Sequence, residues 1–363
     1  MNKISVCTVS MNRLHHIRET LLVNIRENLG FRNIEFVLLD YNSADDLDNW
    51  VRANMLDYIE SGVLKYYQTK EPVYFNISHS KNMASNLSTG DILCMIDADN
   101  YAGPNFVSWI DSVFSRNGNN SLVRASETDA RTHGDLGGKL SFHKQLFATV
   151  RGFDEALQEY GMDDVDLVNR MVKAGGVEFF IEDRDYMKFI SHSIENRLKN
   201  YQLVNRLENM YIQIQANDIM KKKVIILYLM KDYIYYQVTY HFNESIRKDV
   251  TSRMQGWYTE KEGYKEGKSK PLDKGLLLSD TESEMYLEES DQLLISGNGE
   301  KKSVWKKIDR DTSFYMQLVL AYSVCSNFIK YKENDKLQKP VNLTGWGKGT
   351  VYLNFDYNNP IYL

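Results

Sequence analysis

Short apolar runs alternate with helix-patterned segments along the first 195 residues of the chain. The runs have the length of buried strands and lie at 4–9, 34–39, 63–68 and 92–96. Leucines and isoleucines recur at helical spacing between Leu14 and Leu29, and Gly30 follows as a helix-ending residue. Further helices are expected over 46–59, 82–87 and 165–173. This alternation predicts an α/β domain with a largely parallel sheet, flanked by helices, over residues 1–195.

The pattern changes after residue 195. Apolar residues at 203, 207, 212, 219 and 224–230 suggest stripes of helices, so a helical extension is expected over 196–250. Residues 251–363 are expected to form a C-terminal accessory region of mixed α+β structure and unknown role. It should include a helix near Thr312–Tyr331 and a terminal hairpin marked by alternating Val351, Leu353 and Phe355. Deleting 252–363 should then impair acceptor use or assembly while donor binding stays measurable.

Composition narrows the class of protein. The chain has 363 residues, 43% hydrophobic content and a net charge of −5, which fits a globular protein of about two domains and argues against nucleic-acid binding. The three cysteines are odd in number and widely spaced, which indicates core residues in a reducing compartment. No apolar leader opens the sequence, and the longest apolar run, 224–230, is too short to span a membrane. We therefore expect a cytoplasmic protein, with peripheral association at the inner face of the membrane left open.

The segment Asp97-Ala98-Asp99 is the strongest chemical signal. It follows the apolar run 92–96, at the carboxyl end of an expected buried strand. In extended chain, Asp97 and Asp99 would point to the same side, where two carboxylates can hold a divalent cation and the phosphates it bridges. A solvated turn rich in aspartate is the alternative for this motif alone.

Four further segments accompany this D-x-D motif in order: TVSMNR at 8–13, LLDYNSADD at 38–46, ISHSKNMASNLSTGD at 77–91, and a long segment at 137–171 that contains GFDE and GMDD. With them, the sequence resembles the family 2 glycosyltransferases, which have the nucleotide-sugar-binding GT-A fold. The segment 137–171 also looks like the carboxyl half of the metal-dependent galactosyltransferase catalytic domain. The resemblance covers residues 4–195, a little over half of the chain.

The resemblance implies a donor site. Thr8, Ser10 and Arg13 would border the nucleotide, and Asp40 would accept a hydrogen bond from the base, which fits uracil. An Asx turn is the alternative role for Asp40. Lys81 stands where the family usually has arginine and would contact the nucleotide, without the planar contacts of a guanidinium.

The resemblance also implies metal and sugar contacts at the D-x-D. Asp97 would face the ribose or metal-bound water, and Asp99 would ligate Mn²⁺ or Mg²⁺ at the diphosphate. His192 lies after the acid cluster, where related enzymes place a histidine ligand, and imidazole would favour Mn²⁺. His15, His16, His133 and His143 receive no role.

The acids at 163–166 carry the expected reaction. Asp164 matches the family's catalytic base, which takes the acceptor's proton as oxygen attacks the anomeric carbon. Asp163 stands where the family usually has glutamate, and it is expected to contact the acceptor hydroxyl. Helix capping alone is the alternative explanation, because acids favour a helix N-terminus.

The resemblance therefore implies an inverting, metal-dependent hexosyl- or N-acetylhexosaminyltransferase of glycan, glycoconjugate or polysaccharide synthesis. Its donor would be a nucleotide sugar, with UDP favoured, and its acceptor a carbohydrate, lipid-linked or peptide hydroxyl; homo-oligomer formation stays open. One alternative is a non-catalytic sugar-nucleotide-binding or scaffolding protein. A nucleotidyltransferase is another, but TVSMNR lacks the glycines of a phosphate loop.

Overall fold

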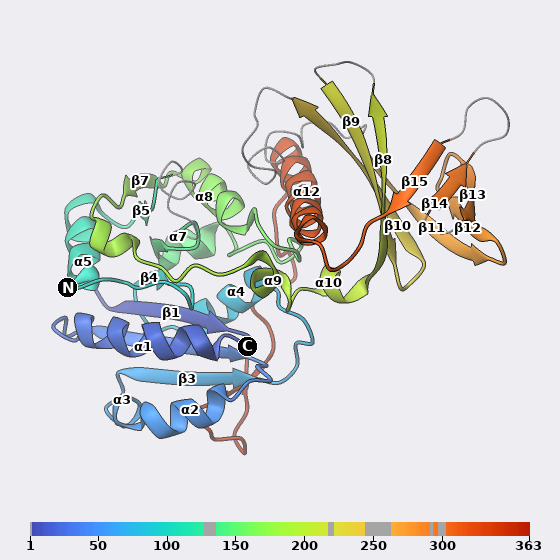
Figure 1. Ribbon diagram of the computed structural model, residues 1–363. Coiled ribbons are helices and arrows are strands. Elements are labelled where there is room, and N and C mark those ends of the chain that lie inside the picture. Colours follow the sequence, from blue (N-terminus) through green and yellow to red (C-terminus); the bar gives the residue numbers. More distant parts are fainter. Residues whose placement is uncertain (1, 127–135, 217–220, 244–262, 291–292, 297–302) are drawn as a thin grey trace. The chain divides into compact units, whose positions relative to one another are not determined.

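The computed structural model describes residues 2–126, 136–216, 221–243, 263–290, 293–296 and 303–363. The chain divides into two compact units (Figure 1). The first comprises Met1–Ser193 together with Tyr331–Leu363, and the second comprises Ile194–Lys330. The expected boundary at residue 195 is close to the observed one. The expectation of one accessory region over 251–363 is wrong, because its last 33 residues belong to the first unit.

The first unit is built on one mixed sheet. Within the described residues it has nine strands in the order β17-β16-β3-β2-β1-β4-β6-β5-β7. The strands from β3 to β4 run parallel to one another, and β6 lies antiparallel between β4 and β5. The strand bounds are β1 Ile4–Ser10, β2 Ile34–Tyr41, β3 Leu64–Thr69, β4 Ile92–Met95, β5 Ser121–Arg124, β6 Leu140–His143, β7 Val177–Phe180, β16 Thr350–Leu353 and β17 Ile361–Tyr362.

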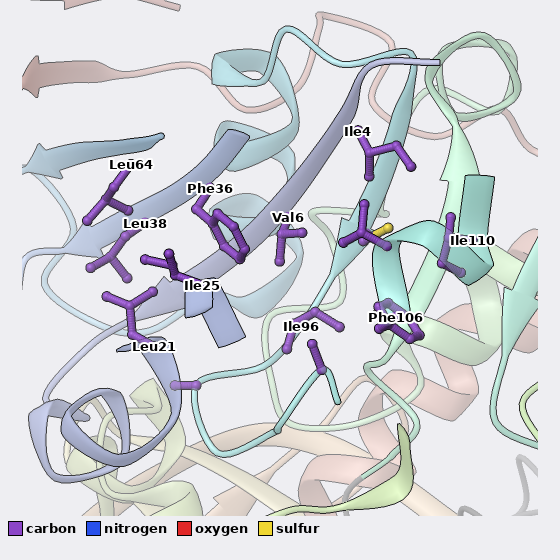
Figure 2. Packing of buried hydrophobic residues seen from close by; sticks show 14 of the residues in the cluster. Ile4, Val6, Leu21, Ile25, Phe36, Leu38, Leu64, Ile96, Phe106 and Ile110 are labelled. Carbon is purple, nitrogen blue, oxygen red and sulfur yellow. The ribbon is translucent and has the colours of Figure 1, made fainter. Parts of the chain in front are cut away.

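Helices cover both faces of this sheet, because its strands alternate apolar side chains between two cores. Ile4 and Val6 of β1 belong to one core, and Cys7 and Val9 belong to the other. The first core, part of which Figure 2 shows, packs against α1 Leu14–Asn28, α2 Leu47–Asn54, α3 Leu56–Glu60 and α5 Phe106–Asn117. The second packs against α4 Ile77–Leu87, α7 Lys144–Thr149 and α8 Asp163–Lys173. The expected α/β architecture is confirmed.

The terminal hairpin is also confirmed, with an addition that the sequence did not predict. β16 pairs antiparallel with β17, and Tyr352 and Leu353 of β16 pair with Gln68 and Tyr67 of β3. The end of the chain thus extends the sheet that its beginning forms.

The second unit is a closed β-barrel in the part of the chain described. Its strands are β8 Leu207–Ala216, β9 Lys221–Met230, β10 Ile234–Asn243, β11 Tyr264–Leu272, β12 Gly275–Ser279, β13 Glu284–Ser290, β14 Leu293–Ser296 and β15 Ser303–Lys307. The short helices α9 Ile194–Leu198 and α10 Gln202–Arg206 precede them. The helix expected near Thr312–Tyr331 is present as α12 Ser313–Leu337, which crosses the boundary between the units.

The helical extension expected over 196–250 is wrong for 207–243, where β8, β9 and β10 lie; residues 244–250 are outside the described part. The reason lies in β9, which is buried on both faces. Leu227 and Leu229 join the core of the barrel, while the ring of Tyr228 packs against that of Tyr322 of α12 with centroids 4.7 Å apart. A strand buried on both faces reads as a continuous apolar run, which periodicity alone does not separate from a buried helix.

Among the residues that the structure describes, none of the helices combines the length and apolar character that crossing a membrane requires.

Candidate active site

The D-x-D segment lies in a turn beyond the end of β4. The strand stops at Met95, and the backbone N–H of Asn100 donates to the carbonyl of Asp97 at 2.9 Å. The extended geometry that would alternate Asp97 and Asp99 is therefore absent from this segment, and that expectation is wrong. The two carboxylates have different partners: Asp97 pairs with Lys81, and Asp99 pairs with His192.

Lys81 brings together two of the acids that the sequence singled out. Its Nζ lies 3.2 Å from Oδ1 of Asp97 and 3.7 Å from Oδ2 of Asp163, and only 2% of its side chain is exposed. Lys81 comes from α4, Asp97 from the turn after β4, and Asp163 from the first turn of α8. Segments about 80 residues apart in sequence thus meet at one ammonium group.

The acid cluster opens α8. Met162 precedes the helix in the left-handed region with φ +71°, which turns the chain so that Asp163 points inward. Burial raises the pKa of Asp163. Lys81 opposes this shift and the charge of Asp164 adds to it, and the resulting pKa is about 7. Asp164 is half-buried, and its Oδ1 accepts a hydrogen bond from the Val165 N–H at 2.8 Å. The two neighbouring acids therefore lie in different environments.

Two glycines face these carboxylates. A Cβ atom at Gly138 would lie 1.9 Å from Oδ2 of Asp97, and one at Gly137 would lie 2.3 Å from Oδ2 of Asp164. Real side chains do not come this close, so a substitution at either glycine must displace a carboxylate. The pair Gly137-Gly138 thus places the acid of the D-x-D turn and the acid of α8 along one stretch of backbone.

Asp99 and His192 have donor atoms that suit a cation such as Mn²⁺. Oδ2 of Asp99 and Nε2 of His192 are 2.9 Å apart, and about a tenth of each side chain is exposed. Two adjacent ligands at about 2.1 Å from one metal ion are separated by about 3 Å, so both atoms fit a shared cation. Within the described residues, no group of three or more His, Cys, Asp or Glu side chains has a metal-binding arrangement. Asp99 and His192 are therefore the two candidate ligands at this position among the residues that the structure describes.

His16 is a neighbour of this pair that the sequence did not single out. It is 3% exposed in α1, and its ring centroid lies 5.2 Å from that of His192. Burial, with a smaller effect of His15, lowers the pKa of His16 to about 4. Its sequence signal was only the pair His15-His16 just after the TVSMNR loop, because contact with His192 depends on tertiary structure.

Lys139 is a second residue that the sequence missed. Its side chain is 1% exposed, and Nζ donates to the Tyr101 carbonyl at 2.5 Å and to the Tyr186 carbonyl. It thereby joins the loop after Asp99 to the 3₁₀ helix Arg184–Met187, which precedes His192. Burial lowers the pKa of Lys139 to about 7, with Asp97 opposing the shift. A polar residue in the apolar stretch GGKLSF was its one sequence signal.

The expected nucleotide residues lie at the carboxyl ends of β1 and β2. Oγ1 of Thr8 donates to the Ile96 carbonyl at 2.9 Å, Ser10 is fully buried, and Arg13 precedes α1. In the parallel register of the two strands, Ser10 is the partner of Asp40.

Asp40 is 1% exposed and already engaged. Its carboxylate accepts hydrogen bonds from Ser43 N–H at 2.8 Å, Tyr66 at 2.8 Å and Gln68 at 3.0 Å. The bond to Ser43 is the turn contact that the sequence offered as the alternative role. Burial raises the pKa of Asp40, and these donors oppose the shift.

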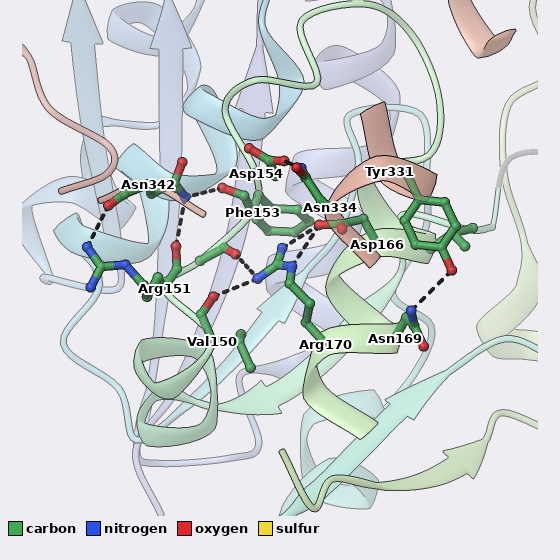
Figure 3. A network of polar contacts seen from close by, with 12 residues as sticks. Val150, Arg151, Phe153, Asp154, Asp166, Asn169, Arg170, Tyr331, Asn334 and Asn342 are labelled. Carbon is green, nitrogen blue, oxygen red and sulfur yellow. Dashed lines mark hydrogen bonds and ion pairs between the residues drawn. The ribbon is translucent and has the colours of Figure 1, made fainter. Parts of the chain in front are cut away.

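Asp166, the third acid of the cluster, is directed into a structural network (Figure 3). Its Oδ2 accepts from Arg170 Nε at 2.9 Å, and the same guanidinium donates to the carbonyls of Val150 and Gly152. Asp166 therefore braces α8 against the preceding loop. Asp163 and Asp164 remain as the acids that lie beside Lys81 and Gly137.

A family model supplies the first comparison. Residues 122–193 match the model described as the N-terminal domain of galactosyltransferase. This segment contains Gly137, Gly138, Asp163, Asp164 and His192. The predicted resemblance to glycosyltransferases is confirmed over this part of the chain.

Several solved structures are similar to part of the chain. The mannosyltransferase PcManGT from Pyrobaculum calidifontis, in complex with GDP-Man and Mn²⁺, is 21% identical over 50% of this chain and 55% of its own, with a TM-score of 0.41. TarS 1–349 from S. aureus, in complex with UDP, is 17% identical over 54% of this chain and 62% of its own, with a TM-score of 0.41.

Glucosyl-3-phosphoglycerate synthase from Mycobacterium tuberculosis, in complex with Mn²⁺, UDP and glucosyl-3-phosphoglycerate, is 16% identical over 54% of this chain and 75% of its own, with a TM-score of 0.38. The chain thus spans between half and two thirds of the mannosyltransferase and of TarS. No curated protein matches the sequence.

Proposed function

We propose that this protein is an inverting, metal-dependent glycosyltransferase that moves a sugar from a nucleotide donor, UDP-linked by preference, to an acceptor hydroxyl. The observation that carries the proposal is the meeting of Asp97, Asp163 and Asp164 at Lys81 and Gly137-Gly138, beyond the carboxyl end of β4. Ligands of α/β sheets bind at this end of the strands. The galactosyltransferase family match over 122–193 supports the same reaction class.

In this proposal Asp164 is the general base. Glycosyl transfer with inversion needs a carboxylate that takes the proton of the acceptor hydroxyl while its oxygen attacks the anomeric carbon. Asp164 is half-buried, so an acceptor has access to it, whereas only 7% of the Asp163 side chain is exposed. Asp163 would orient the acceptor hydroxyl, and Asp97 would face the donor ribose.

Asp99 and His192 would hold the metal ion. A bound divalent cation neutralises the charge that develops on a departing diphosphate. The mixed oxygen and nitrogen donors favour Mn²⁺ over Mg²⁺, which prefers oxygen ligands alone. Thr8, Ser10 and Arg13 would border the nucleotide, and Asp40 would fix the loop that carries it.

The first test is UDP release from a panel of UDP-sugars, measured with Mn²⁺ and with EDTA. We expect slow release from one sugar in the presence of Mn²⁺, because water can replace the acceptor. EDTA should abolish release, and Asp164→Asn should reduce it by about 10²–10⁴-fold, as expected for loss of a general base. The exposed Asp57→Asn in α3 is the matched control and should leave the rate unchanged.

The outcome separates this proposal from a non-catalytic sugar-nucleotide-binding protein. Tight UDP-sugar binding without release, and without transfer to any carbohydrate, lipid-linked or peptide acceptor, would favour the binding protein. Release that is indifferent to EDTA would contradict the role of Asp99 and His192.

A further inference from the structure

Lys81 is surrounded by more negative charge than it neutralises. Only 2% of its side chain is exposed, and its ammonium group contacts the carboxylates of both Asp97 and Asp163. Asp164 adds a third carboxylate whose charge stabilises the ammonium form, and together they raise the pKa of Lys81 despite its burial. The ring of Phe153 lies 5.5 Å from Nζ and closes another side.

Such an arrangement makes the two acids dependent on the lysine. A buried carboxylate without a counter-charge becomes protonated or repels its neighbours, and breaking a buried ion pair by removing one partner is costly. The turn after β4 and the first turn of α8 each place a carboxylate within 4 Å of the Lys81 ammonium group. The lysine therefore fixes the separation between the acid on the donor side and the acids on the acceptor side.

We propose that Lys81 is a positioning residue that ties the D-x-D turn to the acid cluster of α8 and favours the ionised form of Asp163, instead of contacting the nucleotide. The inference rests on the proposed glycosyl transfer for its functional meaning. Its structural content, the coupling of Lys81 to Asp163, is testable without any activity.

The resemblance implies a different role for Lys81, a direct contact with the nucleotide, and this role can be tested separately. A phosphate contact needs an ammonium group with surface to offer, and the side chain of Lys81 is almost fully enclosed. Both of its ion-pair contacts are to carboxylates of the protein. A nucleotide contact would affect donor affinity, whereas a positioning role affects the ionisation of Asp163.

The activity-independent test is a double-mutant cycle in thermal unfolding. Lys81→Met, Asp163→Asn and the double variant are compared with the wild-type protein at about pH 5.5 and about pH 8. The charged groups that face Asp163 are Lys81 of α4, Asp97 of the turn and Asp164 of α8. We expect Lys81→Met to lower Tm more at about pH 8, and Asp163→Asn to restore part of that loss. Equal losses at both pH values with no restoration would overturn the coupling.

The functional test is the pH profile of UDP release. An opposite charge within about 4–6 Å lowers the pKa of a carboxyl group by about 1–3 units. Loss of the Lys81 charge should therefore raise the pKa of Asp163, and Lys81→Met should move the acidic limb of kcat/KM upward by about one pH unit or more. A raised donor KM with an unchanged pH profile would identify a nucleotide contact and overturn the proposal.

Lys65→Met is the matched control for both tests. Lys65 pairs with the buried Glu35 at 2.7 Å, at the start of β3, so its loss removes another ion pair of the same unit. It should lower Tm and leave the pH profile of release unchanged. Absence of UDP release from wild-type protein would count against the proposed function, while the unfolding cycle still decides the role of Lys81.

Discussion

Gly137 and Gly138 are needed as glycines because carboxylate oxygens occupy the space that a side chain at either position would fill. This packing is a property of single atoms: the nearest atom to a Cβ at Gly138 would be an oxygen of Asp97, and at Gly137 an oxygen of Asp164. The two glycines are therefore required because they leave space for the carboxylates, and not because of an unusual backbone angle.

We predict that Gly138→Ala reduces UDP release by about 10²-fold, since displacement of a catalytic group by about 1 Å has effects of this size. The added methyl group must push Asp97 away from its place 3.2 Å from Lys81. Gly30→Ala is the control, because nothing lies within 4 Å of its Cβ position. Equal rates for the two variants would show that Asp97 tolerates the shift.

Glu35 gives a pH-dependent prediction away from the site. Burial favours its neutral form, but hydrogen bonds from Lys65, Ser5 and Thr89 outweigh burial and lower its pKa from 4.5 to about 2. A depressed carboxyl pKa contributes stability above the unfolded-state value and loses it as pH falls toward the folded-state value. This contribution is therefore present at neutral pH and fades between about pH 4.5 and about pH 2.

Urea unfolding of the wild-type and Glu35→Gln proteins measures this contribution of Glu35 to the free energy of unfolding. The free-energy difference between them should be larger at about pH 7 than at about pH 3 by about 2 kcal/mol, out of a pH-dependent part of about 3 kcal/mol in full. A difference that does not change with pH would mean that Glu35 has the same pKa in both states.

The sequence predicted those candidate site residues whose signals lie in short local motifs. Asp97, Asp99, Asp163 and Asp164 belong to short motifs, and each was identified. Lys81 was singled out as a nucleotide contact, but its pairing with Asp163 was not predicted, because the two residues meet only after α4 and α8 have packed on the same face of the sheet. The contact of His16 with His192 likewise joins α1 to a segment about 175 residues away.

At the scale of elements, the C-terminal segment 331–349 secures the loop before the acid cluster. Asn342 accepts a hydrogen bond from Glu155 N–H and donates to the carbonyls of Arg151 and Phe153, at 2.7 and 2.6 Å (Figure 3). Arg151 returns two bonds to the carbonyls of Val341 and Asn342. The loop that leads into α8 is thus held from a segment almost 200 residues away.

Asn342→Ala should therefore destabilise the first unit by about 1–3 kcal/mol, because the carbonyls of Arg151 and Phe153 lose the donor that Asn342 supplies and alanine is placed at a φ of +50°. Thermal unfolding measures the effect. The exposed Asn359→Ala, which removes a hydrogen bond to Asp356 in the C-terminal turn, should stay close to wild type. Equal behaviour of the two variants would show that the contacts of Asn342 carry no net stability.

Elements were predicted best where their apolar runs are short and bounded by polar turns, and worst where the strands are long. The helix α1 and the strands β1 to β4 have clear periods or short lengths bounded by polar turns, and the sequence located them within a few residues. The strands β8 to β10 have ten residues each, and β9 has residues facing both the barrel core and α12, so its apolar run has no visible period of two. The pairing of β16 with β3 had no local signal, because partner choice across 280 residues is decided by tertiary packing.

At the scale of the whole molecule, each unit has its own hydrophobic core. The barrel core includes Leu227, Leu278, Leu287 and Trp305, and shares no residue with the two cores of the sheet. Deletion of residues 252–363 is consequently not a test of the accessory region alone, because it also removes β16 and β17 from the first unit.

Leu287→Ala is a cleaner way to perturb the second unit. Leu287 is fully buried in the barrel, so the substitution should cost about 2–5 kcal/mol there. We expect thermal unfolding of the barrel at a lower temperature, with UDP release by the first unit within about twofold of wild type. A parallel loss of release would show that the first unit depends on the barrel for its activity.

The pairing of β16 with β3 has a consequence for the nascent chain. On the ribosome, β3 is complete once residue 69 has emerged, but its partner strand begins only at residue 350. At the usual ~5–20 residues per second, the edge of β3 waits ~15–60 s for that partner. An unpaired strand edge is a template for association with other chains. Slow translation of the barrel segment should therefore increase aggregation during synthesis, and a chaperone that covers such edges should reduce it.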